Sequence, residues 1–514
     1  MSKVLLINPS YMGSYGGNKM SVVMPILPVL SLATVAAGVR EKGHKVQILD
    51  LAYTKYDPQY IADQIKAYGP DLVGVTALTP HANQLRDMSI LIKDISTNIA
   101  VVAGGPHVSS LPREILLESM LDAVITGEGD FALAEILERG DFRGIDGLYW
   151  RDGDVVISEN PRLPIRDIND LPIPAWDLYD PEIYARVTSK LLCRRPPWAT
   201  IEFSRGCVFK CDYCASKMTM ALGYRKKTPE RCAEEVDTLI RLGFREFMVA
   251  DDIFTSDEKW ATQVCEEIIR RKLDISWTCT NGIRVESADE KLFNTMYAAG
   301  CYRVSFGFES GNDEVLKRFG KGGKATIAQA GIAVDMAKKA KIETNGFFMI
   351  GLSADTKETI EETIEFSRSL PLDILKFSST IAFPGTEMFN NYMKKGLVKS
   401  FDWDDYHIYS SVDLFNHENL SSQEINEYMD AAYRRAIIHN PRFIWRRLLR
   451  GLQTGEFFWD LYYFIKFVFT ATTNESQIEY YARDRWPEYD FHGNGTTPSF
   501  YQKVGSNRIQ KVES

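Results

Sequence analysis

Short apolar runs alternate with amphipathic segments along the first 140 residues of the chain. The apolar runs have the length of strands, and the segments between them repeat apolar residues at helical spacing. The predicted strands are residues 4–7, 46–51, 72–77, 100–103 and 123–126, and the predicted helices are residues 30–42, 59–68, 83–96 and 113–119. Regular alternation of strand and helix predicts a doubly wound parallel sheet with helices on both faces.

A second strand–helix series begins near residue 200. Its predicted strands are residues 200–203, 247–250, 277–280, 303–306, 346–350 and 374–378. Six such units predict a partial (β/α)6 barrel, with its functional residues at the carboxyl ends of the strands. The pattern predicts an α/β protein with a doubly wound domain over 1–140, a linker with a hairpin over 141–195, a barrel over 196–400 and a mixed, mainly helical region over 401–514.

Four loops after strands of the first series have an unusual composition. They comprise residues 8–11, 77–81, 104–107 and 127–130, and read NPSY, ALTPH, GGPH and GEGD. Ligands of doubly wound sheets bind at the carboxyl ends of the strands, and paired glycines let the backbone approach a bulky ligand closely. A tight structural turn would explain any single loop, whereas four at one edge favour a ligand site.

Composition narrows the class of protein. A chain of 514 residues with 45% hydrophobic and 25% charged residues is typical of a soluble protein with several domains. The net charge of −9 argues against nucleic acid as a partner, because such binding needs a basic surface. The N-terminal residues do not resemble a signal peptide, so a cytoplasmic location is expected.

Three of the eight cysteines crowd into one short segment. Cys207, Cys211 and Cys214 follow the first predicted barrel strand, with three and then two residues between them. Three thiolates in one loop can hold a 4Fe–4S cluster and leave its fourth iron without a protein ligand, as a substrate-binding cluster needs. The alternative is a zinc site completed by a distant His or Cys, although zinc loops more often place two residues between cysteines.

This CxxxCxxC loop, with Tyr213 before its last cysteine, resembles that of the radical S-adenosylmethionine (SAM) superfamily. In that family the open iron binds SAM, and one electron from the cluster cleaves SAM to a 5′-deoxyadenosyl radical. Carboxylates at strand ends suit the ammonium group of SAM. The residues that the resemblance places around SAM are Tyr213, Asp251, Asp252, Glu309, Ser310 and Gly351.

The first 140 residues resemble the cobalamin-binding domains that precede radical SAM barrels in methyltransferases and in the anaerobic porphyrin ring cyclase. The residues that this resemblance places around cobalamin are Ser10, Leu78, Thr79, Gly104, Gly105, Pro106, His107, Gly127, Glu128 and Gly129. None of the seven histidines lies in the Asp-x-His-x-x-Gly motif that ligates cobalt in other cobalamin proteins. The resemblance therefore implies cobalamin held without such a ligand, and leaves open whether cobalamin binding is retained.

Together the two resemblances imply an enzyme with a 4Fe–4S cluster, SAM and cobalamin that methylates an unactivated carbon centre. The first alternative is a non-methylating relative, such as an oxidative cyclase or a ring-rearranging enzyme. An alternative of another class is a cobalamin- or zinc-binding sensor with a degenerate barrel. An enzyme of this kind needs an external electron donor such as flavodoxin or ferredoxin. No catalytic residue is assigned.

An aromatic segment follows a series of arginines near the C-terminus. Its members are Trp445, Phe457, Phe458, Trp459, Tyr462, Tyr463 and Phe464. The apolar run is too short, and too interrupted by Asp460 and Lys466, to span a bilayer. A helix that closes the barrel is favoured over a helix on a membrane surface or the lining of an apolar site. The last two alternatives would favour a lipid-like or polycyclic small-molecule substrate.

Overall fold

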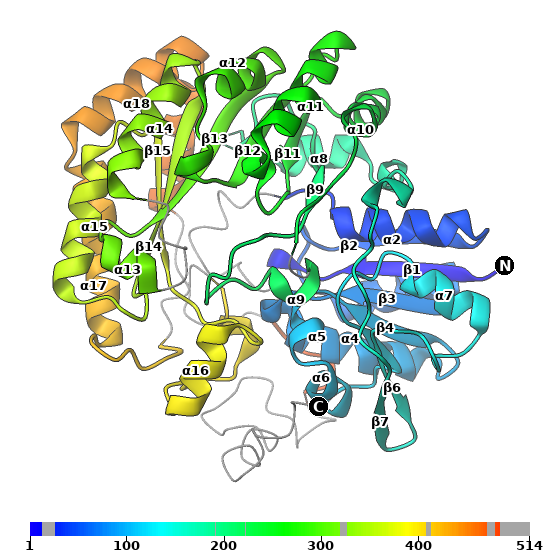
Figure 1. Ribbon diagram of the computed structural model, residues 1–514. Helices are drawn as coiled ribbons and strands as arrows, with labels where there is room; N and C mark the ends of the chain where they lie inside the picture. The colour runs from blue at the N-terminus through cyan, green and yellow to red at the C-terminus, as the bar shows by residue number, and fades with distance from the viewer. Residues whose placement is uncertain are drawn as a thin grey trace.

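Two sheets organise the chain (Figure 1). The computed structural model describes residues 1–12, 26–190, 192–220, 223–318, 326–407, 413–469 and 478–483. The strand order is β2-β1-β3-β4-β5-β6-β7 in the first sheet and β15-β14-β13-β12-β11-β8 in the second. The carboxyl ends of the parallel strands in both sheets point toward a common central region (Figure 1).

The first sheet is doubly wound, as the sequence predicts. Its parallel strands are β1 (Lys3–Asn8), β2 (Lys45–Asp50), β3 (Leu72–Thr76), β4 (Ala100–Gly104) and β5 (Ala123–Ile125). Its helices are α2 (Leu30–Glu41), α3 (Pro58–Tyr68), α4 (Ala82–Ile95), α5 (Pro106–Ser110), α6 (Pro112–Leu117) and α7 (Ala132–Arg139). Strand β1 pairs with β2 on one side and β3 on the other, so the strand order reverses beside β1. Such a reversal is where doubly wound sheets form a ligand crevice.

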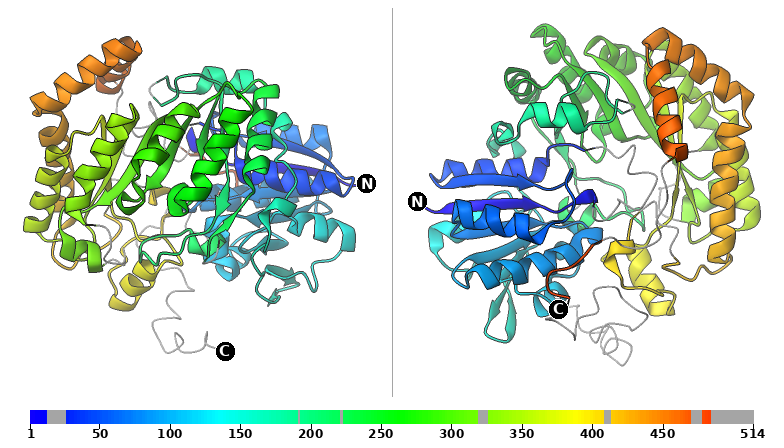
Figure 2. Two further views of the ribbon diagram at one scale, coloured as in Figure 1. Left: turned by 45° about the horizontal axis from the view of Figure 1, so that its top comes forward. Right: turned by 180° about the vertical axis from the view of Figure 1, so that it is seen from behind.

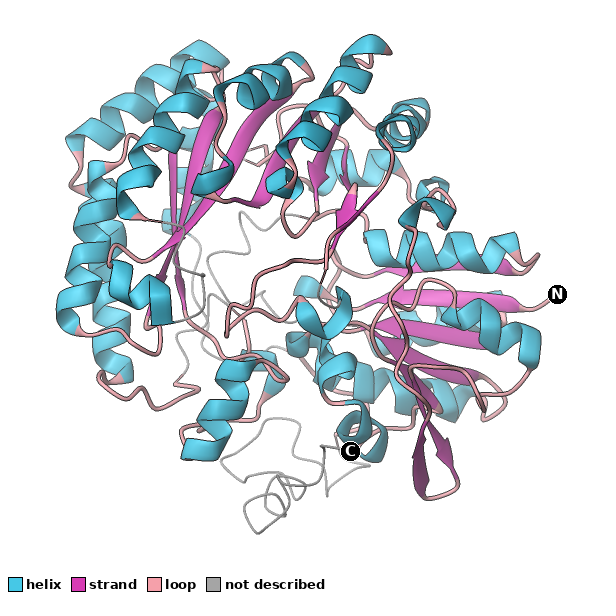
Figure 3. Ribbon diagram, in the orientation of Figure 1, coloured by secondary structure: helices cyan, strands magenta, loops and turns pink. Residues whose placement is uncertain are grey.

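A hairpin extends the first sheet beyond its parallel strands (Figure 3). It consists of β6 (Leu148–Asp152) and β7 (Val155–Ser158), and β6 pairs antiparallel with β5. The sequence places this hairpin in a linker, but in the structure it belongs to the sheet. Its pairing satisfies the backbone groups of β5 that would otherwise form an exposed edge. The chain then continues through η3 (Ile168–Asp170), η4 (Trp176–Leu178) and α8 (Pro181–Val187) to the second sheet.

The second sheet is a parallel, partial barrel. Its strands are β8 (Trp198–Ile201), β11 (Glu246–Val249), β12 (Ser276–Ile283), β13 (Cys301–Glu309), β14 (Glu343–Ile350) and β15 (Ile374–Ser379). Its covering helices are α10 (Pro229–Arg241), α11 (Glu258–Arg270), α12 (Glu290–Ala298), α14 (Ile327–Lys339) and α15 (Lys357–Ser369). The rings of Phe308, Phe348 and Phe377 stack on neighbouring strands, with centroids 5.3–5.4 Å apart, and pack the sheet against its helices.

The C-terminal region is mainly helical where it is described. It contains α16 (Glu387–Lys395), η7 (Trp403–Asp405), α17 (Ser422–Tyr433), the π-helix η8 (Arg434–Ile438), α18 (Pro441–Thr454) and α19 (Phe457–Phe469). Helix α17 covers the edge strand β15, where the Tyr433 hydroxyl donates a hydrogen bond of 2.8 Å to the carbonyl oxygen of Phe377. Residues 408–412, 470–477 and 484–514 of this predicted region lie outside the described residues.

A short C-terminal segment returns to the first domain. The backbone N–H groups of Tyr481 and Ala482 donate hydrogen bonds of 3.0 and 2.7 Å to Asp87 on α4. Residues 478–483 therefore tie the end of the described chain to the first sheet. None of the helices in the described part of the chain is both long and apolar enough to cross a membrane.

Candidate functional site

The three clustered cysteines lie in one loop at the carboxyl end of β8. This Cys loop, residues 206–216, connects β9 (Ser204–Arg205) to α9 (Lys217–Met220). Its thiols are half-buried, and none forms a disulfide among the described residues. The N–H of Phe209 lies 3.5 Å from Cys207 Sγ, as an N–H donor to cluster sulfur would. Three thiols in one accessible loop fit a 4Fe–4S cluster.

The three thiols of the Cys loop do not converge on a position where they could share a single metal ion. Across the described ranges, no three His, Cys, Asp or Glu side chains are close enough together to hold one metal ion. Cys214 Sγ instead lies 3.4 Å from Ser216 Oγ at the start of α9.

A buried ion pair fixes the start of the Cys loop to the first domain. Arg205 donates two hydrogen bonds of 2.8 Å to Asp130 and one of 2.7 Å to Glu202. Burial lowers the pKa of Arg205, but the adjacent carboxylates of Glu202 and Asp130 outweigh burial and raise that pKa above its ordinary value. Because buried charges are stable only when paired, this contact holds the two domains together.

Glu128 makes a second ionic contact between the domains. Its carboxylate accepts a hydrogen bond of 2.9 Å from the guanidinium of Arg225 on β10 (Arg225–Lys226) and one of 2.9 Å from the N–H of Ile165. Strand β10 pairs antiparallel with β9, so residues 128–130 hold both strands that flank the Cys loop. The carboxylate of Glu128 is therefore already occupied by protein groups.

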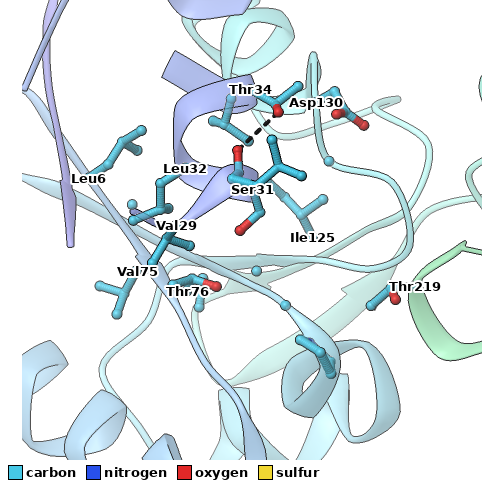
Figure 4. A pocket seen from close by; sticks show the side chains of 18 of the residues that line it. Leu6, Val29, Ser31, Leu32, Thr34, Val75, Thr76, Ile125, Asp130 and Thr219 are labelled. Atoms are coloured by element: carbon cyan, nitrogen blue, oxygen red, sulfur yellow. Dashed lines mark hydrogen bonds between the residues drawn. The ribbon is translucent and has the colours of Figure 1, made fainter. Parts of the chain in front are cut away.

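A cavity of about 320 Å³ lies between the first sheet, helix α2 and helix α9. Apolar side chains from β1, α2, β3 and β5 surround it, including Leu6, Leu32, Val75 and Ile125, and Thr219 of α9 lies on its other side (Figure 4). The cavity lies where the strand order reverses, which is the ligand position expected of such a sheet. Its apolar walls fit a large, partly apolar cofactor such as cobalamin.

The structure brings together seven of the ten residues that the sequence places around cobalamin. Those that line the cavity are Leu78, Gly104, Gly105, Pro106, Gly127, Glu128 and Gly129. Gly105 adopts a φ of +106°, and a Cβ there would lie 2.9 Å from the carbonyl oxygen of Ala77. Gly104 has no heavy atom within 4 Å of where its Cβ would lie, so a side chain there would enter open space. Gly105 thus permits the turn, and Gly104 leaves room in the cavity.

The remaining three residues do not line the cavity; they are Ser10, Thr79 and His107. The N–H of Ser10 donates a hydrogen bond of 3.0 Å to Gln84 on α4, and Thr79 is buried. The ring of His107 lies 5.3 Å from that of Trp403, and burial lowers its pKa to about 3. Ser10 is thus held by α4, whereas Thr79 and His107 are buried outside the cavity lining, and the contact of these three residues with cobalamin stays a prediction.

Sequence reasoning predicted helix α2 but not its place in the cavity wall, and it assigned no role to His81. Residues 29–32, 34 and 35 line the cavity, but small and apolar residues on a helix predict only a core position. The ring of His81 also lines the cavity and stacks on Tyr11 at 5.0 Å. Both ring nitrogens of His81 are buried without a hydrogen-bond partner in the described structure, and burial lowers its pKa to about 3. A buried, neutral imidazole of this kind indicates a ligand contact.

Tyr213 and Glu309 meet beside the Cys loop. The Tyr213 hydroxyl lies 3.5 Å from Glu309 Oε1. Glu309 ends β13 with a left-handed φ of +57°, after a shift in strand register. A Cβ on Gly307 would lie 2.5 Å from the same Glu309 oxygen, so a larger residue there would displace the end of this side chain. Such a strained backbone on a residue other than glycine is characteristic of functional sites.

The two adjacent aspartates after β11 hold the segment around the Cys loop. Asp251 is buried and accepts hydrogen bonds of 2.7 Å from the N–H of Phe203 and 2.5 Å from Ser204 Oγ. Burial raises the pKa of Asp251 to about 8. Asp252 is half-buried, and burial raises its pKa despite hydrogen bonds from Ser216 and the N–H of Gly206. These contacts favour a positioning role for Asp251, whereas Asp252 borders the Cys loop itself.

Ser310 and Gly351 lie at the ends of β13 and β14. Ser310 Oγ is buried 3.3 Å from Thr363 Oγ1 and accepts a hydrogen bond from the N–H of Asn312. Gly351 adopts a φ of +83°, and its N–H donates to Asp355 at 3.0 Å. The side chain of Ser310 therefore organises the turn after Glu309.

Two parts of the chain match known families. Residues 20–137 match the B12 binding domain, and residues 201–367 match the Radical SAM superfamily. The first match includes three of the four loops that contribute to the cavity, and the second includes the Cys loop and Glu309.

The matches extend to whole proteins. An uncharacterized methyltransferase of Pyrococcus horikoshii is 33% identical over 441 residues, covering 83% of this chain and 93% of the relative. An anaerobic magnesium-protoporphyrin IX monomethyl ester cyclase of Rubrivivax gelatinosus is 26% identical over 456 residues, covering 85% of this chain and 79% of the relative. The fold is similar to that of the radical SAM methyltransferase TsrM of Kitasatospora setae, determined with cobalamin and a [4Fe-4S] cluster bound. That similarity has a TM-score of 0.63 at 20% identity and covers 77% of this chain and 75% of the other.

Proposed function

The chain belongs to the cobalamin-dependent radical SAM enzymes, and from that premise we propose that it methylates an unactivated carbon centre of a small molecule. In such an enzyme the cluster supplies the electron that cleaves SAM, and cobalamin carries the methyl group. The similarity to a methyltransferase over most of both chains supports methylation as the outcome.

The main support for the proposal is that both halves of the chain line the cavity. Gly104 and Gly127 line it from the first sheet, and Thr219 and Met220 of α9 line it from the segment after Cys214. A cobalamin in this cavity would lie beside the Cys loop, so both cofactors could act on one substrate. Arg205 and Asp130 maintain this arrangement through their ion pair.

The residues of the chain have distinct proposed tasks. Cys207, Cys211 and Cys214 hold the cluster, and Glu309 accepts hydrogen bonds from the ammonium group of SAM. Tyr213 orients Glu309 through the 3.5 Å contact. His81 is neutral, so one ring nitrogen can donate to, and the other accept from, the amide side chains of cobalamin.

The products formed from SAM test this proposal before the substrate is known. The whole protein is reconstituted anaerobically with iron, sulfide and cobalamin, and is given SAM and a strong reductant. We expect both S-adenosylhomocysteine, from methyl donation, and 5′-deoxyadenosine, from reductive cleavage. Omitting cobalamin should remove the first product only. Absence of S-adenosylhomocysteine in the complete mixture would refute methyl transfer, and absence of both products would favour the sensor.

Oxidative cyclisation is the second candidate, because the chain resembles the Rubrivivax gelatinosus cyclase over 85% of its length. A non-methylating enzyme would form 5′-deoxyadenosine alone in the same experiment. Once a substrate is available, trideuteromethyl-SAM separates the two reactions, because only methylation places the label in the product.

A further inference from the structure

Helices α18 and α19 form a hairpin whose apolar side chains face outward. On α19 the exposed fractions are 76% for Phe458, 65% for Phe464 and 82% for Phe469. On α18 they are 60% for Trp445 and 62% for Leu452. The sequence favours an aromatic helix that closes the barrel, but in the structure α17 covers the edge strand and α19 exposes its aromatic residues. Exposed apolar side chains gathered on two adjacent helices mark an interaction site.

The exposed apolar surface extends around more than half of α19. At 100° per residue, the exposed apolar positions from Phe464 to Trp459 cover an arc of roughly 220°. The side occupied by Asp460 and Tyr463 contacts the rest of the protein, and Phe457 at the start of the helix is half-buried beside Gly451 of α18. One flat protein surface covers a stripe little wider than 100°, whereas a helix embedded in a lipid layer is surrounded.

The hairpin is firmly attached, so its exposure does not reflect a loose segment. Arg447 on α18 pairs with Asp460 on α19 at 2.7 Å, and Arg450 pairs with the buried Glu343 of β14 at 2.8 Å. The N–H of Lys190 donates a hydrogen bond of 3.0 Å to the Tyr463 hydroxyl. These contacts fix the hairpin to the barrel and leave its apolar side chains exposed.

The hairpin lies at the opposite end of the barrel strands from the Cys loop (Figures 1 and 2). Arg450 contacts Glu343 at the start of β14, whereas Glu309 and the Cys loop lie at the carboxyl ends of the strands. The nine residues of β13 separate the two ends by about 30 Å. The exposed aromatic residues therefore do not line the cofactor site.

The hairpin is basic although the whole chain carries a net charge of −9. Residues 434–469, which comprise η8 and the hairpin, contain seven Lys and Arg but only two Asp and Glu, and both acids pair with arginines. Arg442 on α18 and Arg434 in the preceding η8 are exposed, and no acidic partner is found for them among the described residues. Exposed aromatic residues bordered by arginine match the two components of an anionic bilayer surface, its acyl layer and its phosphates.

We propose that the α18–α19 hairpin docks the protein on an anionic lipid surface. Helix α19 enters the boundary between headgroups and acyl chains, and Arg434 and Arg442 contact the lipid phosphates. The helices have 14 and 13 residues, whereas a spanning helix needs about 20, so the hairpin lies in the interface. This docking is independent of the proposed methyl transfer.

Co-sedimentation of the whole protein with vesicles tests the docking. Vesicles of phosphatidylcholine mixed with phosphatidylserine should bind it, and raising the salt should weaken the binding. The double variant Phe458→Asp/Phe464→Asp should lower the apparent affinity at least tenfold. The double variant Arg434→Glu/Arg442→Glu should lose the preference for anionic vesicles. Ile332→Asp, on α14, is the matched control, because Ile332 is also 57% exposed but lies outside the hairpin.

All variants should cleave SAM as the unchanged protein does, since the hairpin lies far from the cofactor site. A protein that stays in the supernatant with anionic vesicles at low salt would overturn the proposal. So would a soluble dimer that Phe458→Asp/Phe464→Asp converts to monomers, because a second copy would then cover the apolar surface. Equal losses in the hairpin variants and in Ile332→Asp would also contradict a specific lipid surface.

Discussion

Arg205 and Asp130 are joined by two hydrogen bonds of 2.8 Å in the interior of the protein. Arg205 precedes Cys207 by two residues, and Asp130 ends a loop that lines the cavity between the domains. One ion pair thus sets the Cys loop relative to the proposed cobalamin site. Neither domain could shift without leaving a buried charge uncompensated.

Asp130→Asn should therefore be strongly destabilising. Arg205 would keep Glu202 but lose its bidentate partner, at a cost of about 3 kcal/mol in the free energy of unfolding. Urea unfolding measures this loss. Asp177→Asn is the matched control, because Asp177 pairs with Arg40 in a partly exposed bridge worth less than about 1 kcal/mol. Equal losses in the two variants would show that the buried pair contributes no more to the free energy of unfolding than the partly exposed pair.

Each of Cys207→Ala, Cys211→Ala and Cys214→Ala should abolish the cluster, because removing one thiolate leaves an iron without its protein ligand. Iron content and visible absorbance after anaerobic reconstitution are the measurements. Cys265→Ala is the control, since Cys265 is buried in the barrel core away from the loop. A full iron complement in any loop variant would overturn the assignment of the three ligands.

Glu309→Gln should weaken SAM binding at least tenfold while the cluster still assembles, because an amide lacks the charge that pairs with the ammonium group. Equilibrium dialysis of the reconstituted protein with SAM measures this effect. Glu314→Gln serves as the control, since Glu314 is exposed and pairs with Lys317. Unchanged affinity in Glu309→Gln would make Glu309 a purely structural residue.

Gly104→Val and Gly105→Ala should impair different properties, the first cobalamin binding and the second stability. Gly104 borders open space in the cavity, so valine there should block cobalamin binding and leave the fold stable. Gly105 has a φ of +106° and a close contact with Ala77, so alanine there should lower the free energy of unfolding. A cobalamin absorbance titration and urea unfolding measure the two effects. Normal cobalamin binding by Gly104→Val would place the cofactor elsewhere.

Asp251 should make the stability of the protein depend on pH. Burial raises the pKa of its carboxyl to about 8, whereas in the unfolded chain it ionises near pH 4. Between these values the folded state binds the extra proton, so the stabilisation is complete below pH 4 and is lost as the pH rises toward 8. Asp251→Asn should flatten this decline in urea unfolding measured across that range. An unchanged slope would mean that other groups cause the pH dependence.

The sequence by itself determined the local elements and singled out the proposed cluster loop. Apolar runs and helical spacing predict both parallel sheets, because burial on both faces of a strand requires a continuous apolar run. The three cysteines form one short loop, so their chemistry is visible without the fold. Of the ten residues that the resemblance places around cobalamin, seven line the cavity.

Only the tertiary structure decided which polar groups remain available and which surface is exposed. Asp251 and Glu128 are suitable ligands by residue type, but contacts with Ser204 and Arg225 already occupy their carboxylates. His81 differs from them, because neither of its ring nitrogens has a hydrogen-bond partner among the described residues. Its neighbours in the fold, which are distant in sequence, decide this. The exposure of α19 likewise depends on the fold, because α17 and not α19 covers the edge strand of the barrel. Availability depends on neighbours brought together by folding, and a linear pattern of residue types does not contain those neighbours.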